Sequence, residues 1–208
     1  DAYSFHLDQA SLEATYDVMA EAYARIFTRL GLRFRKVDAH GGEIGGSRSQ
    51  EFHVLAESGE DRIAWCEGDS FAANVEMAPA APPAIPRPAA RQSLARVATP
   101  GVRSIDEVTA FLKVGAGQCL KTLVVEGTDG GLVALLLRGD HELNPLKAER
   151  APGVARPLRL ASPERVLAAT GAPVGAIGPV NLPLPMVADH SALVLADFVC
   201  GANAPDVH

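Results

Sequence analysis

The sequence is poor in aromatic residues and cysteine, and it contains no long hydrophobic run. Phe, Trp and Tyr make up 5% of its 208 residues. No apolar run reaches the roughly 18 residues that a membrane-spanning helix requires, so we expect no membrane partner. The cysteines, Cys66, Cys119 and Cys200, lie far apart without metal-ligand spacing. Such an odd, scattered set fits reduced thiols in the cytoplasm, and we predict no metal site.

The sequence also lacks the common catalytic motifs. It has no Gly-x-Ser-x-Gly turn, no His-Glu-x-x-His pair and no Cys-x-x-Cys pair, and its six histidines are dispersed. Four glycines at 41–46 lack the spacing and the lysine of a phosphate-binding P-loop. They fit either a connecting loop or a close approach of the backbone to a ligand. Spacing by itself therefore identifies no nucleophile and no base.

The charge of the chain is unevenly distributed. The overall net charge of −6 argues against a general nucleic-acid binder. Residues 1–86 carry 14 acidic and 7 basic side chains, a net of −7, whereas residues 87–208 carry 11 acidic and 12 basic side chains, a net of +1. The second half could therefore meet a polyanion through a local patch.

A proline-rich stretch divides the chain. Five of the ten residues at 79–88 are proline and most of the others are alanine. This composition is typical of a semi-rigid, extended linker, and the charge balance changes at the same place. We therefore predict a first domain at 1–78, a linker at 79–92 and a second domain at 93–208.

The first domain predicts one long helix and several short strands. Asp8 or Ser11 can cap a helix that runs to about Leu30, where Gly31 ends it. Apolar residues recur along it at helical spacing and should face a core. The expected strands are residues 32–37, 52–55 and 62–66, with a further apolar segment at 71–77.

The second domain predicts a mixed sheet with short helices. At its centre, two runs rich in Val and Leu flank a Gly- and Asp-rich turn within residues 121–144, which favours a buried hairpin. Ser104 with Glu107, and Ser162 with Pro163, are typical of helix starts. Further expectations are a short helix within 142–149, an irregular loop at 175–185 and strands at 186–189 and 192–196.

Several polar residues beside these elements allow two interpretations each. Lys121 opens the first strand of the hairpin, either as a solvated lysine or as a cation placed at a pocket. His141 is either a catalytic group or part of a solvated helix start. Asp189 either places a carboxylate at a pocket rim or begins a turn, and Thr99 stands at a strand-to-loop junction. The backbone N–H groups of the loop at 175–185 could bind a ligand.

A series of ordered motifs carries more information than these single residues. The first domain contains Asp-Ala-Tyr-Ser-Phe-His at 1–6, Gly-Gly-Ser-x-Ser-x-Glu-Phe at 45–52 and Ala-Ala-Asn-x-Glu at 72–76. The second contains Lys-Thr-Leu at 121–123, Leu-Val-Ala-Leu at 132–135, Arg-Gly-Asp-His-Glu-Leu-Asn at 138–144, Lys-Ala-Glu at 147–149, Gly-Pro-Val-Asn-x-Pro-x-Pro at 178–185, Asp-Phe at 197–198 and Gly-Ala-Asn at 201–203. Together they resemble an internal piece of a bacterial-type prolyl-tRNA synthetase.

The resemblance implies a fold and a function. The fold would be α/β (α+β), with a YbaK-like editing domain built on a mixed sheet. Beside it would lie part of a class II synthetase core, with an antiparallel sheet and one long helix. The family's inserted domain hydrolyses alanine mischarged onto tRNA(Pro), because a proline-activating pocket cannot exclude the smaller alanine well. Editing would need no cofactor, and the tRNA acceptor end and the rest of the synthetase would be its partners.

The resemblance also assigns residues to roles. Lys121 would contact the phosphate or sugar of the tRNA 3′ end, and backbone N–H groups at 175–179 would stabilise the oxyanion of the ester. A pocket for the methyl side chain would exclude the pyrrolidine ring. By this resemblance the catalytic residues would be Lys121, Gly175, Pro179 and His208. The substrate-binding residues would be Thr99, His141, Gly178 and Asp189.

The sequence departs from the complete family pattern. The first and third class II motifs, most of the second and the anticodon domain are absent, so Asp1, Phe5 and His6 would be remnants of the synthetic site. We therefore expect an internal fragment that does not activate proline by itself. One alternative function is ligation of proline by the complete parent, a homodimer using ATP with Mg²⁺. The other is a non-catalytic module that binds tRNA or stabilises the synthetase core.

Overall fold

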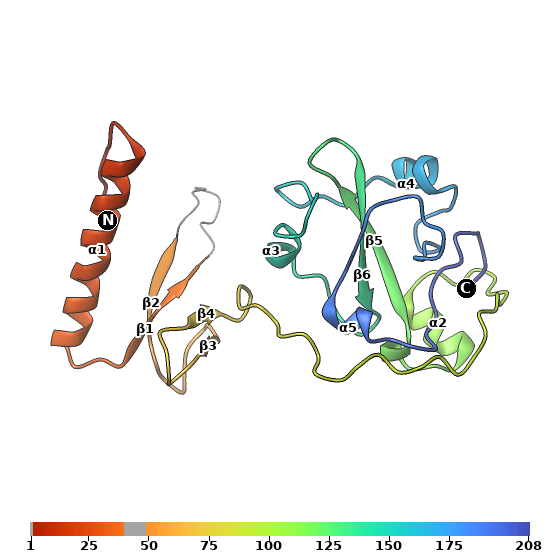
Figure 1. The fold of residues 1–208 in the computed structure, drawn as a ribbon, viewed down its shortest axis with the longest axis horizontal. Coiled ribbons are helices and arrows are strands. Elements are labelled where there is room, and N and C mark those ends of the chain that lie inside the picture. Colours follow the sequence, from red (N-terminus) through yellow and green to blue (C-terminus); the bar gives the residue numbers. More distant parts are fainter. Residues whose placement is uncertain (1, 40–48) are drawn as a thin grey trace. The chain divides into compact units, whose positions relative to one another are not determined.

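The computed structural model of the chain describes residues 2–39 and 49–208. The chain separates into two compact units, Asp1–Pro79 and Ala80–His208 (Figure 1). The glycine-rich stretch at 41–46 and the remnant position Asp1 lie outside the described residues.

The long helix of the first unit begins at the predicted cap. Helix α1 spans Gln9–Arg29, and the Asp8 carboxylate accepts a hydrogen bond from the backbone N–H of Ser11 at 2.8 Å. Asp8, rather than Ser11, is therefore the cap. The expectation that its apolar stripe forms core is wrong in part: α1 contains no fully buried residue. Among the described residues, no helix combines the length and the apolar character needed to cross a membrane.

A cluster of aromatic rings fastens α1 to the sheet of the first unit. Phe27 stacks on Phe52 with ring centroids 5.8 Å apart and lies 5.4 Å from Phe34. Tyr23 approaches Phe52 at 5.6 Å. These contacts join the helix to the first two strands, and they account for the part of the stripe that is covered.

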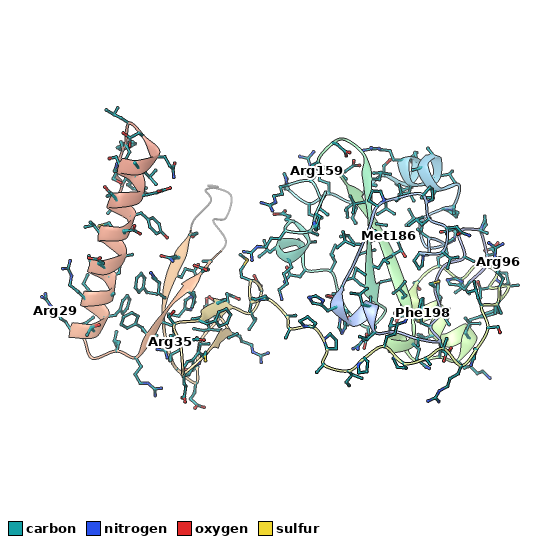
Figure 2. The ribbon with its side chains drawn as sticks, in the orientation of Figure 1. Arg29, Arg35, Arg96, Arg159, Met186 and Phe198 are labelled. Carbon is teal, nitrogen blue, oxygen red and sulfur yellow. The ribbon has the colours of Figure 1, made fainter. Side chains whose placement is uncertain are left out.

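Four short strands form the sheet of the first unit. They are β1 (Phe34–Asp38), β2 (Gln50–Val54), β3 (Ile63–Trp65) and β4 (Ala72–Asn74), in the spatial order β2-β1-β4-β3. The pairs β1–β2 and β3–β4 are antiparallel, as expected, but β1 and β4 pair in parallel at Asp38 and Ala73. Across this sheet the Arg35 guanidinium lies 4.5 Å from the Trp65 ring centroid (Figure 2).

The predicted hairpin forms the centre of the second unit. Strand β5 (Leu120–Glu126) pairs antiparallel with β6 (Leu132–Arg138), and β6 pairs in parallel with β7 (Met186–Ala188). In the turn, the Asp129 carboxylate accepts from the Gly131 N–H at 2.9 Å, and Gly130 adopts φ +78°. The positive φ explains the glycine there. The hairpin and the mixed sheet are confirmed.

Strand β6 is covered on both faces. Every residue from Leu132 to Leu137 is buried, so the strand shows a continuous apolar run instead of an alternating one. Figure 1 shows α3 (Pro145–Ala148) and α4 (Pro163–Thr170) on opposite sides of the hairpin. The core on the α4 side contains Val124, Leu132, Ala134, Val166, Ile177 and Leu182, and the core on the α3 side contains Val125, Val133, Leu135, Leu137, Ala148 and Val154.

Two helices of the second unit, α2 and α4, start at their predicted caps. Helix α2 (Ile105–Leu112) has the complete capping box between Ser104 and Glu107. The Ser162 side chain caps α4, which ends at Gly171 with φ +74°. Helix α3, capped by Asn144, falls inside the predicted range. The predicted caps Ser104 and Ser162 are confirmed.

The strand predicted at 192–196 is wrong. Helix α5 (His190–Leu193) occupies its beginning, and no strand follows it. The Asp189 carboxylate accepts from the Ser191 N–H at 2.9 Å and starts this helix directly after β7. A local cap therefore overrides the strand preference of the apolar run.

Residues 87–92 of the predicted linker hydrogen-bond to residues 195–197 within the second unit. The backbone N–H groups of Arg91 and Gln92 donate to the Asp197 carboxylate at 3.0 and 3.1 Å. The Arg87 side chain donates to the carbonyl of Leu195 at 2.8 Å. These three hydrogen bonds hold the end of the predicted linker along residues 195–197.

We expect Ser104→Ala to weaken α2 selectively. Loss of an N-cap costs about 1 kcal/mol, which corresponds to roughly fivefold faster amide exchange where the helix opens locally. Hydrogen exchange followed by mass spectrometry on peptides covering 104–113 measures this. Ser162→Ala is the matched control, since it should affect α4 alone; equal effects of both variants on both helices would contradict local capping.

Candidate functional site

Thr99 and His208 form a buried polar contact. The Thr99 side chain is 0% exposed, and its hydroxyl lies 2.6 Å from His208 Nδ1. The backbone around them pairs as well: Val97 and His208 exchange two N–H···O hydrogen bonds of 2.7 and 3.0 Å. Residues 97–99 and 206–208, which are distant in sequence, are therefore joined at the two predicted site residues Thr99 and His208.

Burial lowers the pKa of His208 below its usual range, because the imidazolium ion loses hydration in the folded chain. The ring is then neutral at neutral pH, with one nitrogen able to donate and the other able to accept. The Thr99 hydroxyl can satisfy either tautomer. The pair can thus form a fixed wall without introducing a charge.

The loop at 175–179 depends on close backbone approach. Gly175 adopts φ +90°, and a Cβ atom there would lie 3.0 Å from Arg103 Cβ. At Gly178, a Cβ atom would lie 1.7 Å from the carbonyl oxygen of Gly201. Only glycine fits such positions. The loop is irregular, as predicted, and it is pressed against the segment that follows Gly201.

The loop's backbone donors are partly engaged. The Gly178 N–H donates to Asn203 Oδ1 at 2.8 Å, and the Ala176 N–H donates to the Pro173 carbonyl at 3.1 Å. Proline at 179 has no N–H. Within the described part of the chain, the N–H groups of Gly175 and Ile177 have no such partner. An anionic oxygen would therefore find its donors at Gly175 and Ile177, not at Gly178 or Pro179.

Lys121 lies at the beginning of β5, partly buried. Its Nζ donates to the Gly139 carbonyl at 3.3 Å, just beyond the end of β6. Among the described residues, no carboxylate lies within 4.0 Å of the ammonium group. The cation is held in place by a neutral acceptor, and it is thus suited to an anionic ligand.

His141 and Asp189 meet through a residue that the sequence did not indicate. Ser191 Oγ lies 3.1 Å from His141 Nδ1 and also hydrogen-bonds the Asp189 carboxylate. His141 Nδ1 is 3.9 Å from Asp189 Oδ1. Nothing in the residue spacing pointed to Ser191, because the contact joins helix α5 to the loop after β6, 50 residues away in the sequence. Only the Asp-x-Ser pattern of a helix cap was available as a signal.

The Asp189 carboxylate is held in its ionised form. Burial alone would raise its pKa, but hydrogen bonds from the Ser191 hydroxyl and N–H, with His141 and His190 nearby, lower it overall. A bidentate hydrogen bond from Arg138, at 2.6 and 3.0 Å, likewise lowers the pKa of Asp140. Both carboxylates are therefore anions at neutral pH.

The predicted residues gather in two neighbouring groups. The first, at one end of the sheet, contains Lys121, His141 and Asp189: the Asp189 N–H donates to Leu136, while Lys121 lies opposite Leu137. The second contains Thr99, His208 and the loop at 175–179, joined through residues 201–208. Val199, just before residues 201–208, connects the second group to the strand that carries Lys121, because the Leu120 N–H donates to the Val199 carbonyl at 2.8 Å. Phe198, labelled in Figure 2, packs against the cluster formed by Leu120, Leu136 and Ala192.

Two of the three remnant positions, Phe5 and His6, are among the described residues of the first unit. Phe5 is 96% exposed, and the His6 ring contacts only the hydroxyls of Ser4 and Ser11, at 2.8 and 2.9 Å, in the described hydrogen bonds. Elsewhere in this unit, ligand atoms of Glu51, His53 and Asp61 lie within 4.8 Å of one another. Glu51 and Asp61 in this cluster are exposed, and His53 is half-buried.

Comparison with known proteins identifies the second unit. A family model described as the aminoacyl-tRNA editing domain matches residues 99–208. A solved structure described as "hypothetical protein APE2540" is 30% identical, with a TM-score of 0.47, over 54% of this chain and 76% of its own. Another, described as "a putative trans-editing enzyme for prolyl tRNA synthetase", is 35% identical, with a TM-score of 0.40, over 45% of this chain and 60% of its own.

We expect the His208 ring to titrate below the pH at which a solvated histidine does. Because its folded pKa is depressed, the unfolded chain binds the extra proton more readily, so stability falls as pH drops below about 6.5. NMR of the ring nitrogens between pH 4 and 8 measures the titration, and Thr99→Val tests the contact. Protonation at or above the pH of a free histidine peptide would contradict the burial of this ring.

We expect Gly178→Ala to displace the loop at 175–179. The added Cβ would overlap the Gly201 carbonyl, and backbone must move to relieve it, which should lower the stability of the second unit by about 3 kcal/mol. Calorimetric unfolding measures the loss. Gly115→Ala is the control, because its Cβ would meet only Gln118 Oε1 at 3.6 Å. Equal melting temperatures for the two variants would show that the close approach is not required.

Proposed function

Because the chain belongs to the aminoacyl-tRNA editing domain family through residues 99–208, we propose that it hydrolyses alanine from mischarged tRNA(Pro). Such domains cleave the ester between an amino acid and its tRNA. The observation that carries the proposal is the position of the family match. The match spans residues 99–208 and includes the contact between Thr99 and His208, whose side chains meet at 2.6 Å.

The choice of alanine follows from the pocket that Thr99 and His208 would border. Thr99 has no exposed surface and hydrogen-bonds the partly exposed His208 ring, so it would hold that ring in place as one wall of the pocket. A rigid wall can admit a methyl group and exclude the larger pyrrolidine ring by overlap. The motifs shared with prolyl-tRNA synthetases support proline tRNA as the carrier. Sparing proline is essential, because it is the correct product on that tRNA.

The loop at 175–179 would stabilise the reaction's developing charge. Water attacks the ester carbonyl carbon, the carbonyl oxygen becomes an oxyanion, and the bond to the terminal ribose oxygen then breaks. The proton of the water ends on that ribose oxygen, giving free alanine and intact tRNA. The N–H groups of Gly175 and Ile177 are the loop donors available to the oxyanion. The terminal ribose hydroxyl would orient the water, and the neutral His208 ring can accept a hydrogen bond from it.

Lys121 would bind the tRNA 3′ end. Its ammonium group is held by the Gly139 carbonyl at 3.3 Å and is not neutralised by a nearby described carboxylate. A phosphate or sugar oxygen of the terminal nucleotide supplies the missing acceptor. Because residues 87–208 carry a net charge of only about +1 (11 acidic, 12 basic), we expect the chain by itself to bind tRNA weakly.

The proposal extends to the protein that contains this chain. The motifs of the first unit support a place in the class II catalytic core of a cytoplasmic, homodimeric proline–tRNA ligase. In that complete enzyme, ATP with Mg²⁺ would serve proline activation, and editing would proceed without a cofactor. Ligation would require the class II motifs that this sequence lacks.

We expect Lys121→Ala to slow hydrolysis of Ala-tRNA(Pro). Loss of a hydrogen bond to a charged group should reduce kcat/KM by at least about tenfold. Single-turnover release of labelled alanine measures it, with circular dichroism to verify folding. Lys113→Ala is the matched control, since Lys113 is an exposed lysine at the end of α2.

Two outcomes would change the assignment. An unchanged rate in Lys121→Ala would remove this lysine from the mechanism. No hydrolysis by the wild-type chain at any enzyme concentration, although it binds tRNA, would favour a non-catalytic module or an editing site that needs the rest of the synthetase.

A further inference from the structure

The contact between Ser191 and His141 exceeds what a helix cap requires. Asp189 caps α5 by accepting from the backbone N–H of Ser191 at 2.9 Å. The Ser191 hydroxyl adds a second hydrogen bond to the same carboxylate and reaches His141 Nδ1 at 3.1 Å. His141 belongs to a different loop, the one that follows β6. Capping alone explains the first bond but not the link between helix α5 and the loop after β6.

The hydroxyl's single proton fixes the direction of these bonds. Ser191 has one proton to donate, and the ionised Asp189 carboxylate is the stronger acceptor. The hydroxyl oxygen then accepts at His141, so Nδ1 of that ring carries a proton. His141 thus orients the Ser191 hydroxyl, and this hydroxyl in turn holds the Asp189 carboxylate in position.

This arrangement leaves one carboxylate oxygen available. Within the described part of the chain, the hydrogen bonds to the Asp189 carboxylate all fall on Oδ1. The side chain is 42% exposed, so Oδ2 can reach a ligand from solvent. The nearby ionisable groups are His141 and His190, with Arg138 further away and engaged by Asp140. Among the described ion pairs, Asp189 has no lysine or arginine partner.

We propose that Ser191 is a positioning residue that orients Asp189 so that its free oxygen binds the α-ammonium group of the aminoacyl ester. The α-ammonium is the cation that the substrate carries beside its scissile bond, and an oriented carboxylate is its natural acceptor. The inference rests on the proposed function, because it assumes an aminoacyl ester as ligand. It assigns Ser191 a part in recognition of the amino group, separate from recognition of the side chain.

The test compares substrates with and without the positive charge. Ala-tRNA(Pro) and N-acetyl-Ala-tRNA(Pro) are hydrolysed by the wild type, Ser191→Ala, Ser191→Thr and Asp189→Asn. Asparagine caps helices about as well as aspartate, so Asp189→Asn removes the charge while α5 keeps its start. Ser162→Ala, a serine cap outside the site, is the control.

We expect the wild type to favour the free amine by about tenfold in kcat/KM, mainly through KM. Ser191→Ala and Asp189→Asn should lose that preference while they retain the slower hydrolysis of the acetylated ester. Ser191→Thr should keep it, because the hydroxyl remains. Equal losses on both substrates in Ser191→Ala, or no preference in the wild type, would overturn the proposal.

A binding measurement separates this proposal from the proposed function. A non-hydrolysable 3′-alanylamido-adenosine and its N-acetyl form are titrated into the wild type and Ser191→Ala, with NMR of the His141 ring as readout. Tighter binding of the free amine that depends on Ser191 supports the inference even if no ester is hydrolysed, in which case only the proposed function fails. Equal binding of the two compounds contradicts the inference whether or not hydrolysis occurs.

Discussion

The second unit depends on the burial of β6 on both faces. Because the residues from Leu132 to Leu137 are packed from both sides, the strand cannot shift in register without exposing apolar surface. Its two neighbours are fixed by the same ladder, so Lys121 on β5 and Asp189 after β7 come to the same end of the sheet. The charged groups of the site thus take their positions from an apolar strand.

A second constraint is the close contact between the loop at 175–179 and residues 201–203. The loop approaches so near to Gly201 that a side chain at Gly178 would overlap its carbonyl. Asn203 closes the contact, accepting from the Gly178 N–H and donating to Val180. Residues 97–99 also pair through backbone hydrogen bonds with residues 206–208. A loop fixed in this way can present N–H groups to an oxyanion without reorganising during the reaction.

Local signals predicted the elements well, whereas contacts between distant loops escaped them. Caps and turns depend on neighbouring residues, so they can be predicted from sequence. Ser104 and Ser162 predicted the starts of α2 and α4, and the turn at Gly130 predicted the β5–β6 hairpin. The strand predicted at 192–196 is wrong because another local signal, the Asp189 cap, starts helix α5 within the apolar run. Lys121 and Asp189 could be identified as candidates from the sequence. The hydrogen bonds of Ser191 to His141 and Asp189 could be found only in the folded structure.

The most direct test of the account is the rate at which this chain hydrolyses Ala-tRNA(Pro) compared with Pro-tRNA(Pro), measured side by side under single-turnover conditions. The account predicts rapid loss of alanine and retention of proline, with a ratio of kcat/KM of about a hundredfold, in the range that side-chain size alone can give. Equal hydrolysis of both esters would contradict the account, because it would mean that the Thr99–His208 wall does not select by size.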